Sequence, residues 1–213
     1  QEMSRPIAAA PYSLNRLNSA EELADVELEV LASQGDQPAL LLYCMDSHDY
    51  STIKSVKGYG WFTTDQIEWL RNSCMARTEA NGGISVPSLA FFHICLQEYA
   101  QAWNNPKNSR KGKRAEDECP GALNTGMFAA MVESGSVMGT FVGHDHDNDY
   151  VVAEKGIALG YGRFSGDDST YNNLRPGARI IVVEEGQRCF ESWILEDDGR
   201  IAHRMKFSNG KIE

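Results

Sequence analysis

The chain has 213 residues and a mass of 23.6 kDa, long enough to bury a sizeable core, and its 42% hydrophobic and 23% charged residues exclude a disordered acidic tail. A formal net charge of −10 does not favour contact with a nucleic-acid backbone, so we expect no nucleic-acid binding. The longest apolar run, residues 39–45, is far shorter than the roughly 20 residues that a membrane helix needs, so we expect no membrane span.

The first half of the chain alternates predicted strands with predicted helices. Residues 25–31 alternate acidic and apolar side chains and, with the apolar run that follows them, predict a β-hairpin. Residues 63–77 have apolar side chains at helical spacing behind a Thr-Asp-Gln start, which predicts a surface helix. Residues 89–94 are typical of a buried strand, and the polar residues 104–119 are expected to form an exposed excursion.

The second half contains mostly short strands. Residues 125–134 have a helical pattern, and residues 137–142 predict a strand. The short strands expected after that point are 151–153, 157–159, 178–183, 189–194 and 201–205. Helices early and hairpins late indicate an α/β fold in which two sheets pack face to face between helices.

Histidines follow two of the predicted strands. The string Gly-His-Asp-His occupies residues 143–146, directly after a strand, and His93 lies at the end of another. Imidazole is a favoured ligand of Zn, Fe, Ni and Cu, and glycine permits a tight turn beside a bulky site. His93, His144 and His146 are therefore candidate metal ligands. The alternative for any one of them is a polar side chain satisfied by its surroundings.

The acidic residues after these histidines do not form a calcium loop. Tyr150 stands where such a loop needs glycine, and Gly156 stands where it needs a bidentate glutamate. Asp145, Asp147 and Asp149 are instead expected either to orient the imidazoles by accepting hydrogen bonds or to cap the following hairpin.

Two strings carry a resemblance to a known family. Phe-Phe-His-Ile at residues 91–94 and Val-Gly-His-Asp-His-Asp-Asn-Asp-Tyr at residues 142–150 resemble the last two metal motifs of the calcineurin-like metallophosphoesterases, the superfamily that includes the purple acid phosphatases. Residues within 45–51, 59–67 and 161–163 are similar to a purple acid phosphatase-like subgroup. The similarity runs over essentially the entire chain.

The resemblance implies part of a four-layer α/β/β/α sandwich with a β-hairpin-rich C-terminal half. Residues 1–213 would be a single domain, the C-terminal part of a phosphoesterase domain. It also implies a dinuclear centre of Fe, Zn or Mn at which a metal-bound hydroxide attacks a phosphoester substrate. His93 and His144 would share one metal, and His146 would bind the other. Asp145, Asp147 and Asn148 would then support these ligands, with a structural role as the alternative. The family resemblance further suggests an extracytoplasmic location, periplasmic or secreted.

The departure from the family pattern is in its earlier motifs. D-x-H, G-D-x-x-D and G-N-H-D do not precede His93 in that order, and Asp-Ser-His at residues 46–48 is interpreted as a coincidental match to the first of them. The chain begins at Gln1, without an initiator methionine, so we expect a piece of a longer protein. A missing N-terminal segment would then supply the remaining ligands and the leaving-group histidine.

This departure changes what we expect of the chain by itself. Three neutral imidazoles cannot offset two metal ions, so we expect at most one weakly bound metal and little or no phosphatase activity. Arg163, after a predicted strand, is a candidate for bidentate contact with substrate phosphate, with a structural arginine as the alternative. Tyr59 and Trp61 are expected to form a packed aromatic corner. The competing hypothesis is a non-catalytic module of the same fold that binds a partner protein or a glycan.

Overall fold

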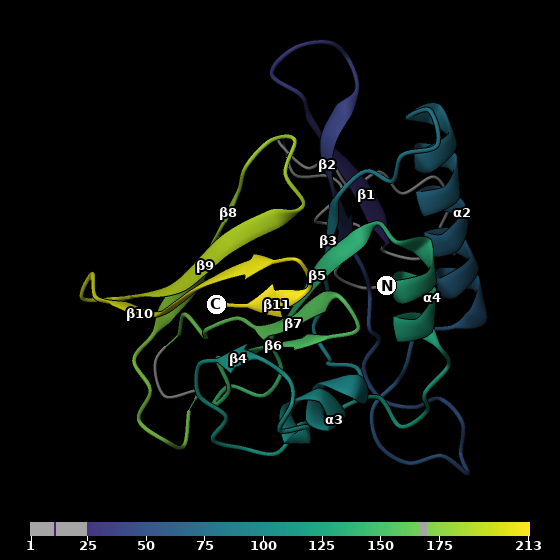
Figure 1. Ribbon diagram of the computed structural model, residues 1–213. Helices are drawn as coiled ribbons and strands as arrows, with labels where there is room; N and C mark the ends of the chain where they lie inside the picture. Colours follow the sequence, from purple (N-terminus) through teal and green to yellow (C-terminus); the bar gives the residue numbers. More distant parts are fainter. Residues whose placement is uncertain (1–10, 12–24, 167–169) are drawn as a thin grey trace.

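Two β-sheets occupy the centre of the protein in the computed structural model, which describes residue 11 and residues 25–166 and 170–213 (Figure 1). The elements in chain order are β1 (Val26–Leu31), β2 (Pro38–Cys44), α2 (Thr64–Ala80), β3 (Ser88–Phe91), α3 (Glu98–Asn104), β4 (Arg110–Lys111), α4 (Met127–Ser134), β5 (Val137–Val142), β6 (Val151–Glu154), β7 (Ile157–Tyr161), β8 (Gly177–Val183), β9 (Cys189–Glu196), β10 (Ile201–Ser208) and β11 (Lys211–Ile212). None of the described helices is both long and apolar enough to span a membrane.

The larger sheet brings four strand ends to one edge. It has seven strands in the order β1-β2-β3-β5-β7-β6-β4, and β2, β3, β5 and β7 are parallel to one another. The second sheet is antiparallel, with the order β11-β10-β9-β8. Because loops after parallel strands leave the sheet on the same side, the segments that follow β2, β3, β5 and β7 meet at one edge, where ligands bind in sheets of this kind.

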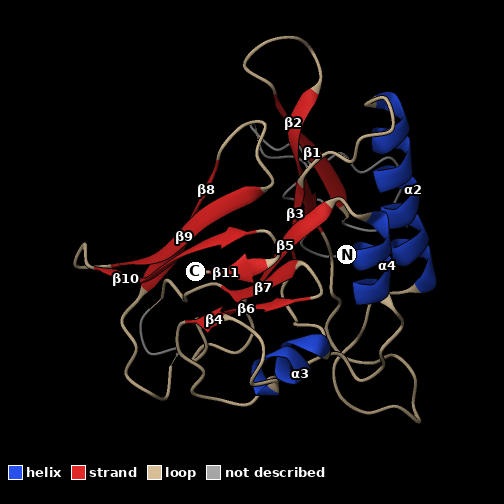
Figure 2. Ribbon diagram, viewed as in Figure 1, coloured by secondary structure: helices blue, strands red, loops and turns tan. Residues whose placement is uncertain are grey.

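Two hydrophobic clusters separate the layers. One lies between the larger sheet and the helices, where Leu70 of α2 and Met131 of α4 pack with Tyr43 of β2. The other lies between the two sheets, where Met138 of β5 packs with Phe190 of β9. Figure 2 shows the helices α2 and α4 on one side of the larger sheet and the second sheet on the other. The described part is thus a mixed α/β fold of helices, large sheet and small sheet.

The fourth layer of the expected sandwich is not confirmed. Over residues 25–166 and 170–213, no helix covers the outer face of the second sheet. The β-hairpin-rich C-terminal half is present, because β8, β9, β10 and β11 pair consecutively.

Local sequence signals account for several element boundaries. Helix α2 begins with Thr63 as its N-cap, and Gln66 completes a capping box by accepting from the Thr63 backbone N–H at 2.9 Å. Strand β5 is buried along its whole length, as expected for a strand covered on both faces.

The excursion expected at residues 104–119 is only partly exposed. Strand β4 pairs with β6, and the Glu118 side chain is 1% exposed because it accepts two bonds from Arg114 and one from the Tyr150 hydroxyl. The expectation of an exposed excursion thus holds for much of this segment, including Lys113, Asp117 and Cys119, whereas the Glu118 side chain is covered by its partners.

Candidate metal centre

The imidazoles of His93 and His144 lie side by side at the carboxyl edge of the larger sheet. His93 follows β3 and His144 follows β5, and these are neighbouring parallel strands. His144 Nδ1 lies 3.3 Å from His93 Nε2, and the ring centroids are 5.1 Å apart with the rings nearly perpendicular. The structure thus brings together two of the three histidines singled out in the sequence, although their metal role stays a prediction.

Gly143 permits this approach. An ideal Cβ at residue 143 would lie 3.2 Å from His93 Nδ1, which is closer than most Cβ contacts allow. The Gly143 amide also donates to the His93 carbonyl at 3.1 Å, which holds the two strand ends in register. His144 itself has a φ of 39°, a left-handed conformation that is uncommon for residues other than glycine. The backbone therefore turns sharply where the first imidazole of the Gly-His-Asp-His string leaves the strand.

The spacing of the two nitrogens suits a shared metal ion. Two imidazole nitrogens bound at 2.0–2.1 Å to one tetrahedral ion are separated by about 3.3 Å, and the observed separation is 3.3 Å. Partial burial and the nearby His144 and His146 lower the pKa of His93. A lowered pKa keeps this imidazole neutral at pH 7, which is the form that binds metal.

His146 is the third candidate histidine and lies two residues after His144. Its side chain is exposed, and its ring centroid lies 6.4 Å from that of Phe164. Its charge contributes to the lowered pKa of His93, so it lies within electrostatic range of the pair. Within the described residues, no three His, Cys, Asp or Glu side chains are grouped closely enough to hold a metal ion. Among residues 25–166 and 170–213, the candidate donors are thus two neighbouring imidazole nitrogens and the exposed imidazole of His146.

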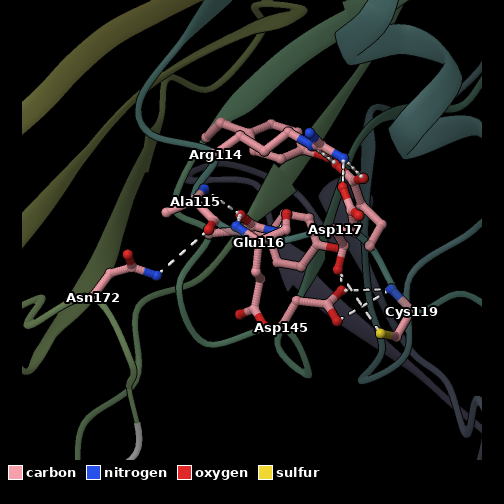
Figure 3. Close-up of polar contacts among 11 residues, drawn as sticks. Arg114, Ala115, Glu116, Asp117, Cys119, Asp145 and Asn172 are labelled. Atoms are coloured by element: carbon pink, nitrogen blue, oxygen red, sulfur yellow. Dashed lines mark hydrogen bonds and ion pairs between the residues drawn. The ribbon is translucent and has the colours of Figure 1, made fainter.

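The buried carboxylate of Asp145 anchors a loop. It accepts a hydrogen bond from the Tyr161 hydroxyl at 2.5 Å. It also accepts one from the Cys119 amide at 3.2 Å, a contact that Figure 3 shows. The thiol of Cys95 lies 3.8 Å from the same carboxylate. Asp145, which lies between His144 and His146 in sequence, thus joins Tyr161 at the end of β7 to Cys119.

Asp147 and Asn148 form similar anchors. The Asp147 carboxylate accepts from the Tyr171 amide at 3.0 Å and from the Asn172 side chain at 2.6 Å. The Asn148 Oδ1 accepts from the amides of residues 115 and 116 at 2.9 and 3.2 Å. Together with Asp145, these two side chains hold the segments 115–119 and 171–172 against the Gly-His-Asp-His segment. Their expected role in orienting the imidazoles directly stays a prediction.

Arg163 is buried in an ion-pair network. Its side chain is 2% exposed, pairs with the buried carboxylate of Asp149, and donates to the Arg175 carbonyl at 2.7 Å. Glu196 of the second sheet lies 3.4 Å away. This arrangement favours the structural alternative for Arg163, and its contact with substrate phosphate stays a prediction.

The Asp-Ser-His string after β2 does not join the imidazole pair. His48 Nε2 lies 2.9 Å from Gln66 Oε1 at the start of α2, and the Asp46 carboxylate accepts from the His48 amide at 2.8 Å. This histidine is therefore engaged by the first turn of α2, and the interpretation of the string as a coincidental match stays a prediction.

Sequence reasoning missed two contacts at the site. The Tyr161 hydroxyl reaches Asp145, yet in the sequence Tyr161 is only one more apolar position in a strand. Tyr59, expected in a packed aromatic corner, does pack, and its partner is the His144 ring at a centroid distance of 4.4 Å. The aromatic string at residues 59–61 carried no signal of which ring it would contact.

Comparison with known proteins gives relatives of one kind. No family model matches the chain. It is 30% identical over 212 residues to an Arabidopsis thaliana protein named probable inactive purple acid phosphatase 29. The aligned region covers 91% of this chain and 54% of that protein. It is 30% identical over 142 residues to phosphatase DCR2 of Saccharomyces cerevisiae, over 64% of this chain and 22% of that protein.

A solved structure shows the same fold. The dimetal phosphatase from Danio rerio superposes with a TM-score of 0.50 and 14% identity, covering 87% of this chain and 60% of that chain. The mixed α/β architecture is thus similar to the fold of that structure. The chain is a relative of purple acid phosphatase-like proteins, in agreement with the calcineurin-like metallophosphoesterase superfamily that its motifs indicated. It spans about half the length of the first of these relatives, 54%.

Proposed function

We propose that this chain supplies the C-terminal ligands of a metal centre that hydrolyses phosphoesters. The observation that carries the proposal is the 3.3 Å separation between His144 Nδ1 and His93 Nε2 at the carboxyl edge of the larger sheet. The remaining ligands and the leaving-group histidine would come from a missing N-terminal segment of the same protein. Fe, Zn and Mn are the metals proposed for the complete centre, and a location outside the cytoplasm stays a prediction from the family resemblance.

The roles of this chain's residues follow from their positions. Bound metal ions would supply Lewis acidity toward the phosphate oxygens. His93 and His144 would hold one ion as neutral imidazoles, which the lowered pKa of His93 favours. His146, exposed beside Phe164, would face the second ion. Asp145 and Asp147 hold the surrounding loops, so their part is to keep the histidine segment in place.

A non-catalytic binding module of the same fold is the second candidate. One observation favours it: Arg163 and the carboxylates of Asp145, Asp147 and Asp149 are all engaged in buried contacts, which leaves few charged groups for chemistry. The relatives also divide, since the Arabidopsis protein is named probable inactive and the yeast protein is named a phosphatase.

Metal titration separates the two candidates. We expect the purified chain to bind one Zn²⁺ or Mn²⁺ ion weakly, and His93→Ala and His144→Ala each to abolish that binding. His48→Ala is the matched control, because His48 also follows a parallel strand but contacts Gln66. Hydrolysis of p-nitrophenyl phosphate should be near zero for the chain and should appear when the upstream segment is restored.

The outcomes are distinct. Metal binding that survives both substitutions would remove the basis of the proposed centre. Metal binding through the pair without hydrolysis in the extended protein would favour the binding module. Rapid hydrolysis by this chain alone would contradict the need for an upstream segment.

A further inference from the structure

A cleft of about 390 Å³ lies at the amino-terminal edge of the parallel strands in the larger sheet. It is bounded by the end of α4 and the start of β5, by the turn between β6 and β7, and by the turn between β10 and β11. The imidazole pair follows β3 and β5, so the cleft and the pair lie at opposite edges of the sheet. A cleft of this size holds a small organic molecule.

Much of the lining of this cleft is apolar. Its apolar side chains are Met131, Val132, Val137, Ile157 and Phe207. Met131, Val137 and Ile157 belong to the cluster between the larger sheet and the helices, whereas Phe207 belongs to the cluster between the two sheets. The cleft therefore reaches the edge of both clusters, and an apolar group that enters it would be shielded from water.

Two cations complete the lining. Arg188, in the hairpin between β8 and β9, donates from Nη1 to the Ser136 carbonyl at 2.9 Å and from Nη2 to the Val137 carbonyl at 3.2 Å. A guanidinium has five N–H donors, so these two bonds leave three. Lys155, in the turn between β6 and β7, is the second cation, and its side chain is 66% exposed.

The charge of Arg188 is not compensated by an acid of this chain. Within the part of the chain that the structure describes, its polar contacts are the two carbonyls alone. Acidic residues close to the lining in sequence are engaged elsewhere: Glu154 pairs with Lys155 at 2.9 Å, Glu133 pairs with an arginine of α2, and Glu185 accepts from the Ser33 amide. Burial lowers the pKa of Arg188. A bound anion would offset the cost of keeping this charge partly out of water.

We propose that this cleft binds a small organic carboxylate that carries an apolar chain. The carboxylate would accept from the N–H groups that Arg188 has left, and the chain would lie against the apolar lining. A single carboxylate fits better than a phosphate dianion because the second cation, Lys155, already pairs with Glu154. The inference goes beyond the proposed function and does not depend on it, because the cleft uses none of the residues of the proposed metal centre.

NMR titration of the purified chain tests the inference. Hexanoate is compared with hexanol, which keeps the chain without the charge, and with acetate, which keeps the charge without the chain. EDTA is present throughout, so that no carboxylate is held by a metal ion. Hexanoate should bind at least about tenfold more tightly than either. The amide resonances that shift should be those of residues 131–137, 155–157 and 207–210, and those of residues 93 and 143–146 should stay in place.

Four variants assign the roles of the two cations. Arg188→Gln should weaken hexanoate at least about tenfold and leave hexanol unchanged, because only the charge-assisted bonds are lost. Arg188→Lys keeps the charge without the planar fork and should give an intermediate affinity. Lys155→Gln should weaken hexanoate by only about twofold, since this side chain is exposed. Arg204→Gln removes an exposed arginine paired with Glu191, away from the cleft, and should have no effect.

Each outcome decides for or against the cleft. Loss of hexanoate binding with hexanol binding retained in Arg188→Gln supports the inference. Equal affinity of the unchanged chain for hexanoate and hexanol would contradict the part given to Arg188, and hexanoate that fails to bind at millimolar concentration would remove the site. Shifts centred on residues 93 and 143–146 would overturn its location. If Arg188→Gln loses both ligands, the arginine shapes the cleft, and the ratio of the two affinities in the unchanged chain decides.

Discussion

The loops after β2 and β5 each carry a histidine in a left-handed conformation, with φ of 62° at His48 and 39° at His144. Both loops leave the same edge of the larger sheet, and both contain an Asp next to the histidine. His48 nevertheless contacts Gln66 of α2, whereas His144 contacts His93. A histidine after a strand is therefore not enough to form a site.

The residue before the histidine accounts for part of the difference. Gly143 lacks the Cβ that would approach His93 Nδ1, so the two rings can meet. In the other loop Ser47 is buried and its hydroxyl accepts from the Ile94 amide at 2.9 Å. That contact ties the loop to the segment after β3, while His48 points to the helix cap. The imidazole pair therefore depends on the absence of a side chain at Gly143 as well as on the two histidines themselves.

The largest predicted effect is on the anchor of the histidine loop after β5. Arg163→Leu should reduce the free energy of unfolding by about 3 kcal/mol, because it removes the arginine that pairs with the buried carboxylate of Asp149 and leaves that carboxylate only the Lys113 amide and His203. Urea denaturation measures this change. Arg175→Leu, which removes an exposed arginine paired with exposed Asp197, should cost much less, because solvent screens that pair. Equal effects of the two variants would contradict the description of Arg163 as an interior anchor.

A second prediction concerns the loop after β2. Gln66→Ala removes the capping-box partner of Thr63 and the contact with His48, and should lower the free energy of unfolding by about 2 kcal/mol. Metal affinity should not change, since Gln66 does not contact the imidazole pair. A tenfold loss of Zn²⁺ affinity in this variant would mean that the two loops are coupled.

A third prediction tests whether the imidazole pair needs a glycine at residue 143. Gly143→Ala should weaken Zn²⁺ binding about tenfold, equivalent to about 1.4 kcal/mol, by pushing the His93 ring away from His144. Gly166→Ala is the control, because an added Cβ at that position has no neighbour within 4 Å. Calorimetric titration of both variants measures the difference, and unchanged affinity for Gly143→Ala would show that the ring can give way.

The smallest effect is a pH dependence in the loop that Asp145 holds. Burial of Glu118 opposes its ionisation, but hydrogen bonds from Arg114 and Tyr150 outweigh burial and lower its pKa. A carboxyl group whose pKa is lower in the folded state contributes stability above its unfolded pKa of about 4.3 and loses it as the pH falls below that value. Glu118→Gln should therefore flatten the decline of the denaturation midpoint between about pH 5 and 3.

Asp117→Asn provides the comparison for that measurement. Asp117 pairs with the same arginine, but its side chain is 94% exposed. Its removal should leave the acid profile nearly unchanged because solvent screens the pair. An equal flattening in both variants would point to the arginine alone as the source of the effect.

Local patterns predicted much of the fold. The hairpin of β1 and β2, helix α2 and strand β5 all carry their signal within a few consecutive residues. Helix α3 was missed because it is short and begins without a side-chain cap, and β4 was missed because its two residues pair only with the distant β6.

The site was predictable only in part, for a related reason. The Gly-His-Asp-His string and the strand-end position of His93 indicated which imidazoles to consider. Nothing near Asp145 in the sequence indicates that its carboxylate accepts from Tyr161 and Cys119, because those contacts join segments 16 and 26 residues away. Long-range hydrogen bonds of this kind depend on how the sheet and loops pack, which a periodicity cannot reveal.

The double-sided burial of β5 has a consequence for local opening of the molecule. Amide hydrogens of a strand covered on both faces exchange with solvent only when much of the molecule opens, whereas exposed turns exchange through small fluctuations. Deuterium uptake should therefore be slow in β5, residues 137–142, and fast in the exposed loop around Tyr50. One imidazole of the pair thus extends from an element whose amides exchange late, close to a loop whose exposed amides exchange early.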